Sequence, residues 1–185
     1  MLLILFLFDY LIGSFPSAFI LTKLIAHRNI LELGDHNVGA RNVYHVLGKK
    51  IGLLTFILDG LKGYLIFLLS IYFQLPLPHL FLSIFFGWLG HCFPVWLKGK
   101  GGKGVALIIG FLVPQHLLST VVSAIFFIPI KKWVKDFDLS YTLSVVIFCI
   151  LVVFEKVSFP YFICMVLLFF LPLTKALLFF NHNRR

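Results

Sequence analysis

The sequence predicts an all-α, polytopic membrane bundle of about seven helices, and two observations support that prediction. Of the 185 residues, 61% are hydrophobic and only 12% are charged, whereas soluble chains are about 25% charged. The apolar residues also come in long runs with short breakers between them, which leaves no stretch for a second, soluble domain. We therefore expect residues 1–185 to form a single integral membrane domain.

The apolar runs divide into seven predicted spans. The first run lacks the basic start and small-residue cleavage site of a removable signal, so we expect it to remain as a helix. Residues 105–130 are open to two interpretations, one helix kinked at Pro114 or two short helices joined by a turn. The predicted spans are 2–25, 51–73, 80–97, 105–113, 115–130, 139–154 and 159–180.

Charge placement favours two helices in that region. With the N-terminus outside and the C-terminus inside, seven spans put nearly all Lys and Arg residues on the inner side, as the positive-inside rule requires. A single span over 105–130 would move the basic segment 131–138 to the outside. The basic residues outside the predicted inner segments are Lys62, Lys156 and Lys175.

Ionisable residues within spans are costly and mark candidate sites. Asp59 and Lys62 stand three apart and share a helix face, so we interpret them as a neutralising pair that faces the bundle interior, with substrate contact as the alternative. The stretch "GSFPSAF" (13–19) breaks the first helix and suggests a close helix crossing. His91, at the end of the third span, is open to a packing or a functional role.

Other residue types narrow the function. The three cysteines lie in apolar runs without metal-ligand spacing, so we expect neither a metal nor a cofactor. The net charge of +9 reports membrane orientation first and an anionic lipid or substrate second. Nucleic acid is a poor fit because no basic soluble domain is present. His79 and His116 fall in predicted outer loops, where we expect them to be solvated.

The segment 99–104, "GKGGKG", is the clearest candidate for a ligand site. It matches the G-x-G-x-x-G nucleotide pattern, but it follows a membrane helix where that pattern needs a strand, and it is not a Walker A loop. Glycines allow successive N–H groups to surround phosphate oxygens, and the next helix is expected to begin near Val105 with its N–H groups facing the loop. We predict phosphate binding by Lys100, Gly101, Gly102, Lys103 and Gly104.

A second loop on the predicted inner face, residues 32–50, is rich in Gly, Asn and His. Asn37 and Asn42 flank Gly39, and their amides both donate and accept hydrogen bonds. Two such loops on one face predict a site at the bilayer surface that holds a polar phosphate while an apolar partner lies in the lipid.

These segments resemble the bacterial inner-membrane acyl-phosphate-dependent glycerol-3-phosphate acyltransferases over almost the whole chain. The matching stretches are "YLIGSFPSAFILTKL" (10–24), "NVGARNVYHVLGKK" (37–50), "LDGLKG" (58–63) and "GHCFPVWLKGKGGKGVA" (90–106). The last is the most specific. The resemblance implies seven spans with the N-terminus outside and the phosphate-binding loops on the cytoplasmic face, in agreement with the charge placement.

The resemblance also implies the reaction. Such enzymes transfer a fatty acyl group from acyl phosphate to a hydroxyl of glycerol 3-phosphate and give lysophosphatidic acid for phospholipid synthesis. They use no metal, CoA or acyl carrier directly, and substrate phosphate is proposed to help take the proton. By resemblance Lys103 is the main charged phosphate ligand, and Asn37, Asn42 and His91 help to build the site.

Several family positions differ in this chain. Where the family reads G-S-G-N-x-G-A-T-N-x-x-R, the functional Ser is Asp35, the Thr is Arg41 and the functional Arg is His45. Arg41 and His45 are four apart and would share a helix face, so Arg41 is a candidate substitute for the missing Arg. In the family's C-terminal H-x-x-N, Asn183 is kept but Phe180 replaces His, and His182 is the candidate substitute.

We therefore predict a divergent acyltransferase with Asp35, Arg41, His45 and Asn183 at the catalytic positions. Two alternatives stay open. One is a non-catalytic paralogue that binds a phosphate-bearing lipid or metabolite, and the other is a small transporter.

Overall fold

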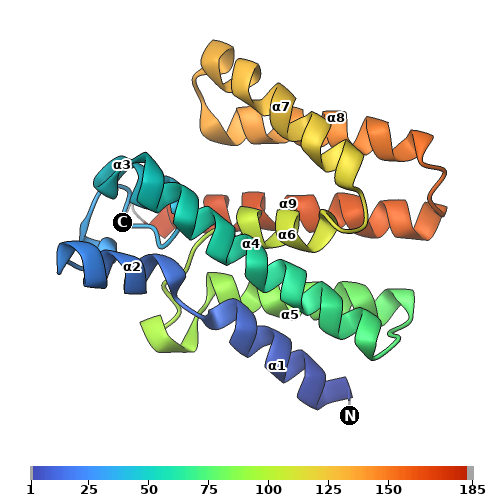
Figure 1. Ribbon diagram of the computed structural model, residues 1–185, viewed down its shortest axis with the longest axis horizontal. Helices are drawn as coiled ribbons and strands as arrows, with labels where there is room; N and C mark the ends of the chain where they lie inside the picture. Colours follow the sequence, from blue (N-terminus) through green and yellow to red (C-terminus); the bar gives the residue numbers. More distant parts are fainter. Residues whose placement is uncertain (1, 183–185) are drawn as a thin grey trace. The chain divides into compact units, whose positions relative to one another are not determined.

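The computed structural model describes residues 2–182, and the side chains of residues 2–175. All its regular structure in these residues is helical, and the chain divides into two compact units, Met1–Phe111 and Leu112–Arg185 (Figure 1). Within residues 2–182, five segments are long and apolar enough to cross a membrane: Leu2–Ala26, Lys49–Tyr72, Leu77–Leu97, Leu117–Val134 and Phe137–Phe154. The predicted helical membrane bundle is therefore confirmed, while the count of seven spans and the orientation of the termini remain predictions.

The first unit is built around three long helical segments. Its elements are α1 (Leu2–Ser14), α2 (Ser17–Ala26), a 3-10 turn (Ile30–Glu32), α3 (Ala40–Leu47), α4 (Lys49–Tyr72), α5 (Leu77–Cys92), a second 3-10 turn (Val95–Leu97) and α6 (Val105–Leu112). The most extensive helix packing in this unit is between α1 and α5, with α4 against both (Figure 1). The break between α1 and α2 confirms the effect expected of "GSFPSAF", because Pro16 cannot donate a helical hydrogen bond.

Glycines let these helices touch backbone to backbone. A Cβ on Gly13 of α1 would lie 1.9 Å from the Gly87 carbonyl oxygen of α5. A Cβ on Gly63 of α4 would lie 1.8 Å from the Leu107 carbonyl oxygen of α6. The predicted close helix crossing is thus confirmed for α1, and a second one joins α4 to α6. Small residues commonly line such membrane-helix contacts.

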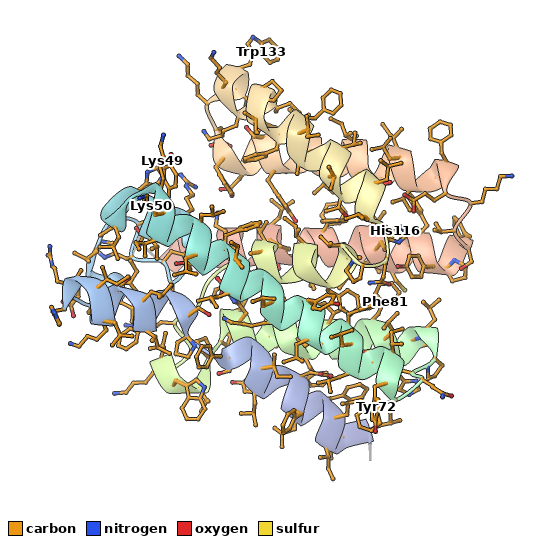
Figure 2. All side chains as sticks on the ribbon, in the orientation of Figure 1. Lys49, Lys50, Tyr72, Phe81, His116 and Trp133 are labelled. Atoms are coloured by element: carbon orange, nitrogen blue, oxygen red, sulfur yellow. The ribbon has the colours of Figure 1, made fainter. Side chains whose placement is uncertain are left out.

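The α4 helix has one basic and one aromatic end. Its 24 residues extend over about 36 Å, enough for the hydrocarbon core of a bilayer. Lys49 and Lys50 begin the helix, and Tyr72 ends it (Figure 2). Lysines and tyrosines are typical of membrane–water interfaces, so both ends of α4 have residues suited to them.

The second unit contains α7 (Leu117–Val134), α8 (Phe137–Phe154) and α9 (Phe159–His182). Because α6 ends at Leu112 and α7 begins at Leu117, the two-helix interpretation of residues 105–130 is confirmed. The eight residues of α6 extend only about 12 Å, which is too short to cross a bilayer alone. The predicted inner loop 131–138 is largely helical, because lysines near the C-terminus of α7 interact favourably with the helix dipole.

The prediction of a solvated His116 is wrong. Its side chain is buried at the start of α7, and Nδ1 lies 2.5 Å from Glu155 Oε2 while Nε2 lies 2.9 Å from the Tyr161 hydroxyl (Figure 2). The Ser119 hydroxyl donates to the other Glu155 oxygen. Burial acts to raise the pKa of Glu155, but the hydrogen bonds from Ser119 and His116 and the attraction to His116 lower it overall. His79 is half-buried.

Candidate active site

The glycine loop has a fixed shape and is attached to the end of α5. The Gly101 and Gly102 N–H groups donate to the carbonyls of Cys92 and His91, at 3.1 and 3.2 Å. On the other side, Trp88 Nε1 donates to the Lys103 carbonyl at 3.0 Å. These bonds distinguish the loop from a flexible basic turn, because the backbone on both sides of its centre is held by one helix.

The glycines serve close packing as well as phosphate access. A Cβ on Gly101 would lie 2.0 Å from the His91 carbonyl oxygen, and one on Gly102 would lie 2.3 Å from His91 Nε2 and 2.7 Å from the Val38 carbonyl oxygen. Gly104 has a φ of +86° and faces Trp88, so only glycine fits there without strain. At Gly101 and Gly102 a larger residue would meet backbone oxygen atoms and could fit only if the backbone moved.

Four N–H groups of the predicted phosphate nest already have backbone partners, and phosphate binding by the loop stays a prediction. The N–H groups of Gly99, Lys100, Gly101 and Gly102 already donate to carbonyls of residues 91–97, so they do not form the ring of donors expected over the whole loop. The first N–H groups of α6, which begins at Val105 as expected, have no carbonyl partner within the helix. Together with half-buried Lys103, this helix start is the part of the loop best suited to an anion.

Asn42 organises the second loop. It is fully buried, and its Nδ2 donates to the carbonyls of Leu33 and Asn37, at 2.9 and 3.0 Å. Its Oδ1 accepts from the Asp35 N–H at 2.9 Å. The nitrogen and the oxygen atom of the Asn42 side chain are both hydrogen-bonded to backbone groups, so the residue stabilises the shape of the loop. Direct contact of Asn42 with phosphate remains a prediction. Half-buried Asn37 is likewise untested as a ligand.

The two loops meet, as the sequence predicted. A buried apolar cluster joins Val38 of the second loop to Leu97, which precedes the glycine loop, and includes Ala18 of α2. The backbone of Val38 also lies against Gly102. Both loops are therefore part of one packed region of the first unit.

The departures from the family pattern lie close together on this region. Arg41 and His45 both lie on α3, one turn apart, and both are exposed. Arg41 Nε lies 3.8 Å from Asp35 Oδ2, so two of the changed positions pair with each other. A carboxylate at position 35 would repel a phosphate on its own, and the nearby guanidinium offsets that repulsion. The alternative residues thus form a charge-balanced pair.

The Asp59–Lys62 pair confirms the interpretation of a neutralising pair. Both side chains are buried, Lys62 Nζ lies 2.7 Å from Asp59 Oδ1, and it also donates to the Phe15 carbonyl at 2.5 Å. That carbonyl lies at the break between α1 and α2, where helical hydrogen bonding stops. Lys62 therefore neutralises a carboxylate and satisfies a carbonyl freed by the helix break.

Sequence reasoning missed Trp88 as part of the site. The sequence could have indicated it, because Trp88 lies within a predicted membrane span and an indole N–H there needs a hydrogen-bond acceptor. Asn183 lies outside the described residues, as do the side chains of Phe180 and His182, so their assignment stays a prediction.

A family model for glycerol-3-phosphate acyltransferase matches residues 3–184 of the chain. The chain belongs to this family. It is 38% identical over 161 residues to the glycerol-3-phosphate acyltransferase of Bartonella henselae, which covers 85% of this chain and 75% of that protein. It is 37% identical over 171 residues to the one of Pelagibacter ubique, with 91% and 87% covered.

A solved structure is also similar. The crystal structure of PlsY, an integral membrane glycerol 3-phosphate acyltransferase, in its glycerol 3-phosphate form has a TM-score of 0.84 and 28% identity, and the match covers 99% of this chain and 90% of that one. The crystal structure of its lysophosphatidic acid form has a TM-score of 0.83 to this chain. The resemblance to this acyltransferase family is confirmed, and a match over nearly the whole chain does not favour a transporter or a non-catalytic binding protein.

Proposed function

We propose that this glycerol-3-phosphate acyltransferase uses acyl phosphate as donor and yields lysophosphatidic acid. The observation that supports the proposal best is the fixed glycine loop, in which Lys103 lies two residues before the start of α6 at Val105. An ammonium group and a helix N-terminus both stabilise phosphate oxygens. PlsY is known in a glycerol 3-phosphate form and a lysophosphatidic acid form, which fits the same substrate and product here.

The reaction depends on the positioning of the two substrates and on the stabilisation of charge more than on a strong nucleophile of the protein. The glycerol hydroxyl oxygen attacks the acyl carbon, an ester C–O bond forms, the C–O bond to phosphate breaks, and inorganic phosphate leaves with the bonding electrons. A phosphate oxygen takes the hydroxyl proton. Lys103 and Arg41 stabilise the charge on the phosphates, and His45 lies one turn from Arg41 on the same face of α3.

In this proposal the site faces the cytoplasm from the inner membrane of a bacterium. The basic residues near the two loops, Lys49 and Lys50 at the start of α4 and Lys98 and Lys100 beside the glycine loop, support that orientation. The aromatic end of α4 would then lie at the outer surface.

Acyl transfer in reconstituted vesicles tests the proposal. The full chain, given acyl phosphate and glycerol 3-phosphate, should form lysophosphatidic acid, and Lys103→Ala should reduce kcat/KM by at least ~100-fold, as loss of a charge-stabilising group does. Lys156→Ala is a matched control, because it removes an exposed lysine of the second unit. A chain that binds glycerol 3-phosphate but forms no product with acyl phosphate, acyl-CoA or acyl carrier protein would instead be a non-catalytic paralogue.

The Asp35–Arg41 pair has a test of its own. Arg41→Ala should raise KM for the phosphate substrates by ~10-fold or more, because Asp35 then meets them without its partner. Asp35→Ser/Arg41→Thr, which removes both charges, should be less impaired than Arg41→Ala. Equal impairment in the two variants would mean that Arg41 acts independently of Asp35, and an unchanged Arg41→Ala would remove Arg41 from the site.

A further inference from the structure

A small cavity, lined mainly by apolar surface but with several polar groups, lies beside Gly101 of the glycine loop. It has a volume of about 10 Å³, and its lining includes Ser17 of α2, Asp59 and Lys62 of α4, His91 of α5 and Gly101 of the loop. A cavity of about 10–15 Å³ with two to four polar partners is the size and composition that holds one water molecule. The lining therefore brings together a hydroxyl, an ion pair and an imidazole at a place where one small polar molecule fits.

Ser17 gives the second indication of an occupant. Its side chain is 2% exposed, and its Oγ has no hydrogen-bond partner among the described residues. A buried hydroxyl without a partner is rare in native proteins, because it loses its hydrogen bonds to water on folding and this loss costs free energy when no new bond replaces them. Since Ser17 also lines the cavity, a molecule in the cavity would supply the partner.

The charges of the lining select a neutral occupant. Lys62 disfavours a cation, and Asp59 disfavours an anion, while the 2.7 Å contact between them leaves the pair close to neutral. Water suits the polar groups of the lining, because it can donate to a carboxylate and accept from an ammonium or a hydroxyl. An apolar molecule would leave the Ser17 hydroxyl without a partner.

We propose that one ordered water molecule occupies this cavity, joins Ser17 to the Asp59–Lys62 pair and His91, and thereby positions the glycine loop. The loop depends on this region directly, because the Gly102 N–H donates to the His91 carbonyl and Gly101 packs on the same carbonyl. Ser17 is thus a positioning residue that does not touch substrate. The kinetic part of this inference rests on the proposed function, whereas the water site does not.

A crystal structure of the full chain at a resolution that shows ordered water tests the site directly. The expected result is one density peak within hydrogen-bond distance of Ser17 Oγ and of the Lys62 ammonium or Asp59 carboxylate. A dry cavity, or a Ser17 hydroxyl turned to a backbone carbonyl, would overturn the proposal. This measurement needs no activity, so its failure is separate from failure of the proposed function.

The direction in which Ser17→Ala changes Tm gives a second test of the water site. If the hydroxyl bonds to a water molecule, the substitution removes a hydrogen bond and should lower Tm by roughly 2–4 °C. If the hydroxyl has no partner, alanine removes a desolvation penalty and Tm should rise. Ser70→Ala is the matched control, because Ser70 is equally buried but its hydroxyl bonds to Ile66 of its own helix at 2.8 Å.

Kinetics separate positioning from stability alone. Ser17→Ala should raise KM for glycerol 3-phosphate by ~5-fold, the equivalent of about one hydrogen bond, while kcat changes less and Ser70→Ala keeps the wild-type KM. A Ser17→Ala variant with lowered Tm and unchanged KM would confine the water to a structural role and overturn its role in positioning the loop.

Discussion

The buried Asp59–Lys62 pair allows a quantitative test of the structure. Lys62→Met removes the ammonium group, keeps a similar side-chain length, and leaves Asp59 without its partner in a site where its side chain is only 4% exposed. It also leaves the Phe15 carbonyl without the ammonium donor. Asp59→Asn is the milder change, because an amide oxygen can still accept from Lys62.

The expected cost follows from distance and burial. At 2.7 Å and an effective dielectric constant of ~20, the attraction is about 6 kcal/mol before desolvation is subtracted. Desolvation of both ions offsets part of it, and loss of one partner from a buried pair costs about 3–5 kcal/mol of unfolding free energy. We expect Lys62→Met to fall in that range and Asp59→Asn to cost less.

A double-mutant cycle separates the pair from its surroundings. The cycle consists of Asp59→Leu, Lys62→Met and the double variant Asp59→Leu/Lys62→Met. The double variant replaces both charges with apolar groups, which suits a membrane-embedded site, and should be more stable than Lys62→Met alone. Equilibrium unfolding in mixed micelles with SDS measures all variants. A coupling energy of at least ~2 kcal/mol is expected. Single variants that each cost less than ~1 kcal/mol, or a double variant whose cost is their sum, would refute the reasoning.

Three further predictions concern other contacts. Gly63→Ala should cost about 3 kcal/mol of unfolding free energy, because its Cβ would meet the backbone of α6 at 1.8 Å, whereas Gly60→Ala on the same helix, at 3.6 Å, should cost less than ~1 kcal/mol. Glu155 has a lowered pKa, so its stabilising contribution is present above the unfolded-state value of about 4.5 and is lost as the pH falls through the folded-state value; Tm should therefore fall more steeply below pH 4.5 in wild type than in Glu155→Gln. Trp88→Phe removes the donor to the Lys103 carbonyl and should raise KM for glycerol 3-phosphate by ~5-fold.

Each of these predictions has a contrary outcome. Equal unfolding free energies for Gly63→Ala and Gly60→Ala would contradict the close contact between α4 and α6. Parallel curves of Tm against pH for wild type and Glu155→Gln would contradict the lowered pKa. A Trp88→Phe variant with unchanged KM would mean that the loop keeps its shape without the indole bond.

The fold could be predicted from the sequence because the bilayer allows few solutions. Long apolar runs must form helices, since their backbone groups need internal partners, and the Pro114 region and the pair at 59 and 62 followed from the same reasoning. The helix over residues 40–47 was less evident, because only the spacing of Arg41 and His45 indicated it. The close approach of Gly63 to α6 could not be predicted from the sequence of either helix alone.

The meeting of the two loops could be predicted from the sequence, whereas their detailed shape could not. Glycine and lysine content indicated the loop at 99–104, whose role as a phosphate site stays a prediction, and its contact with the second loop is confirmed. The spacing of residues in the sequence cannot reveal that the N–H groups of Gly101 and Gly102 donate to carbonyls of α5, because those hydrogen bonds depend on where the end of that helix lies. The bond of His116 to Glu155 was missed for the same reason, since the two residues are far apart in the sequence.

The hydrogen-bonded state of the glycine loop also bears on how a substrate would be captured. A loop whose backbone is already fixed by Trp88 and by the end of α5 loses little conformational freedom when a phosphate arrives. Binding should then resemble the docking of an ion in a rigid receptor, with a small entropic cost and an association rate governed mainly by charge and salt. A rigid site of this kind can bind a dilute, water-soluble phosphate substrate at a rate set mainly by diffusion and charge.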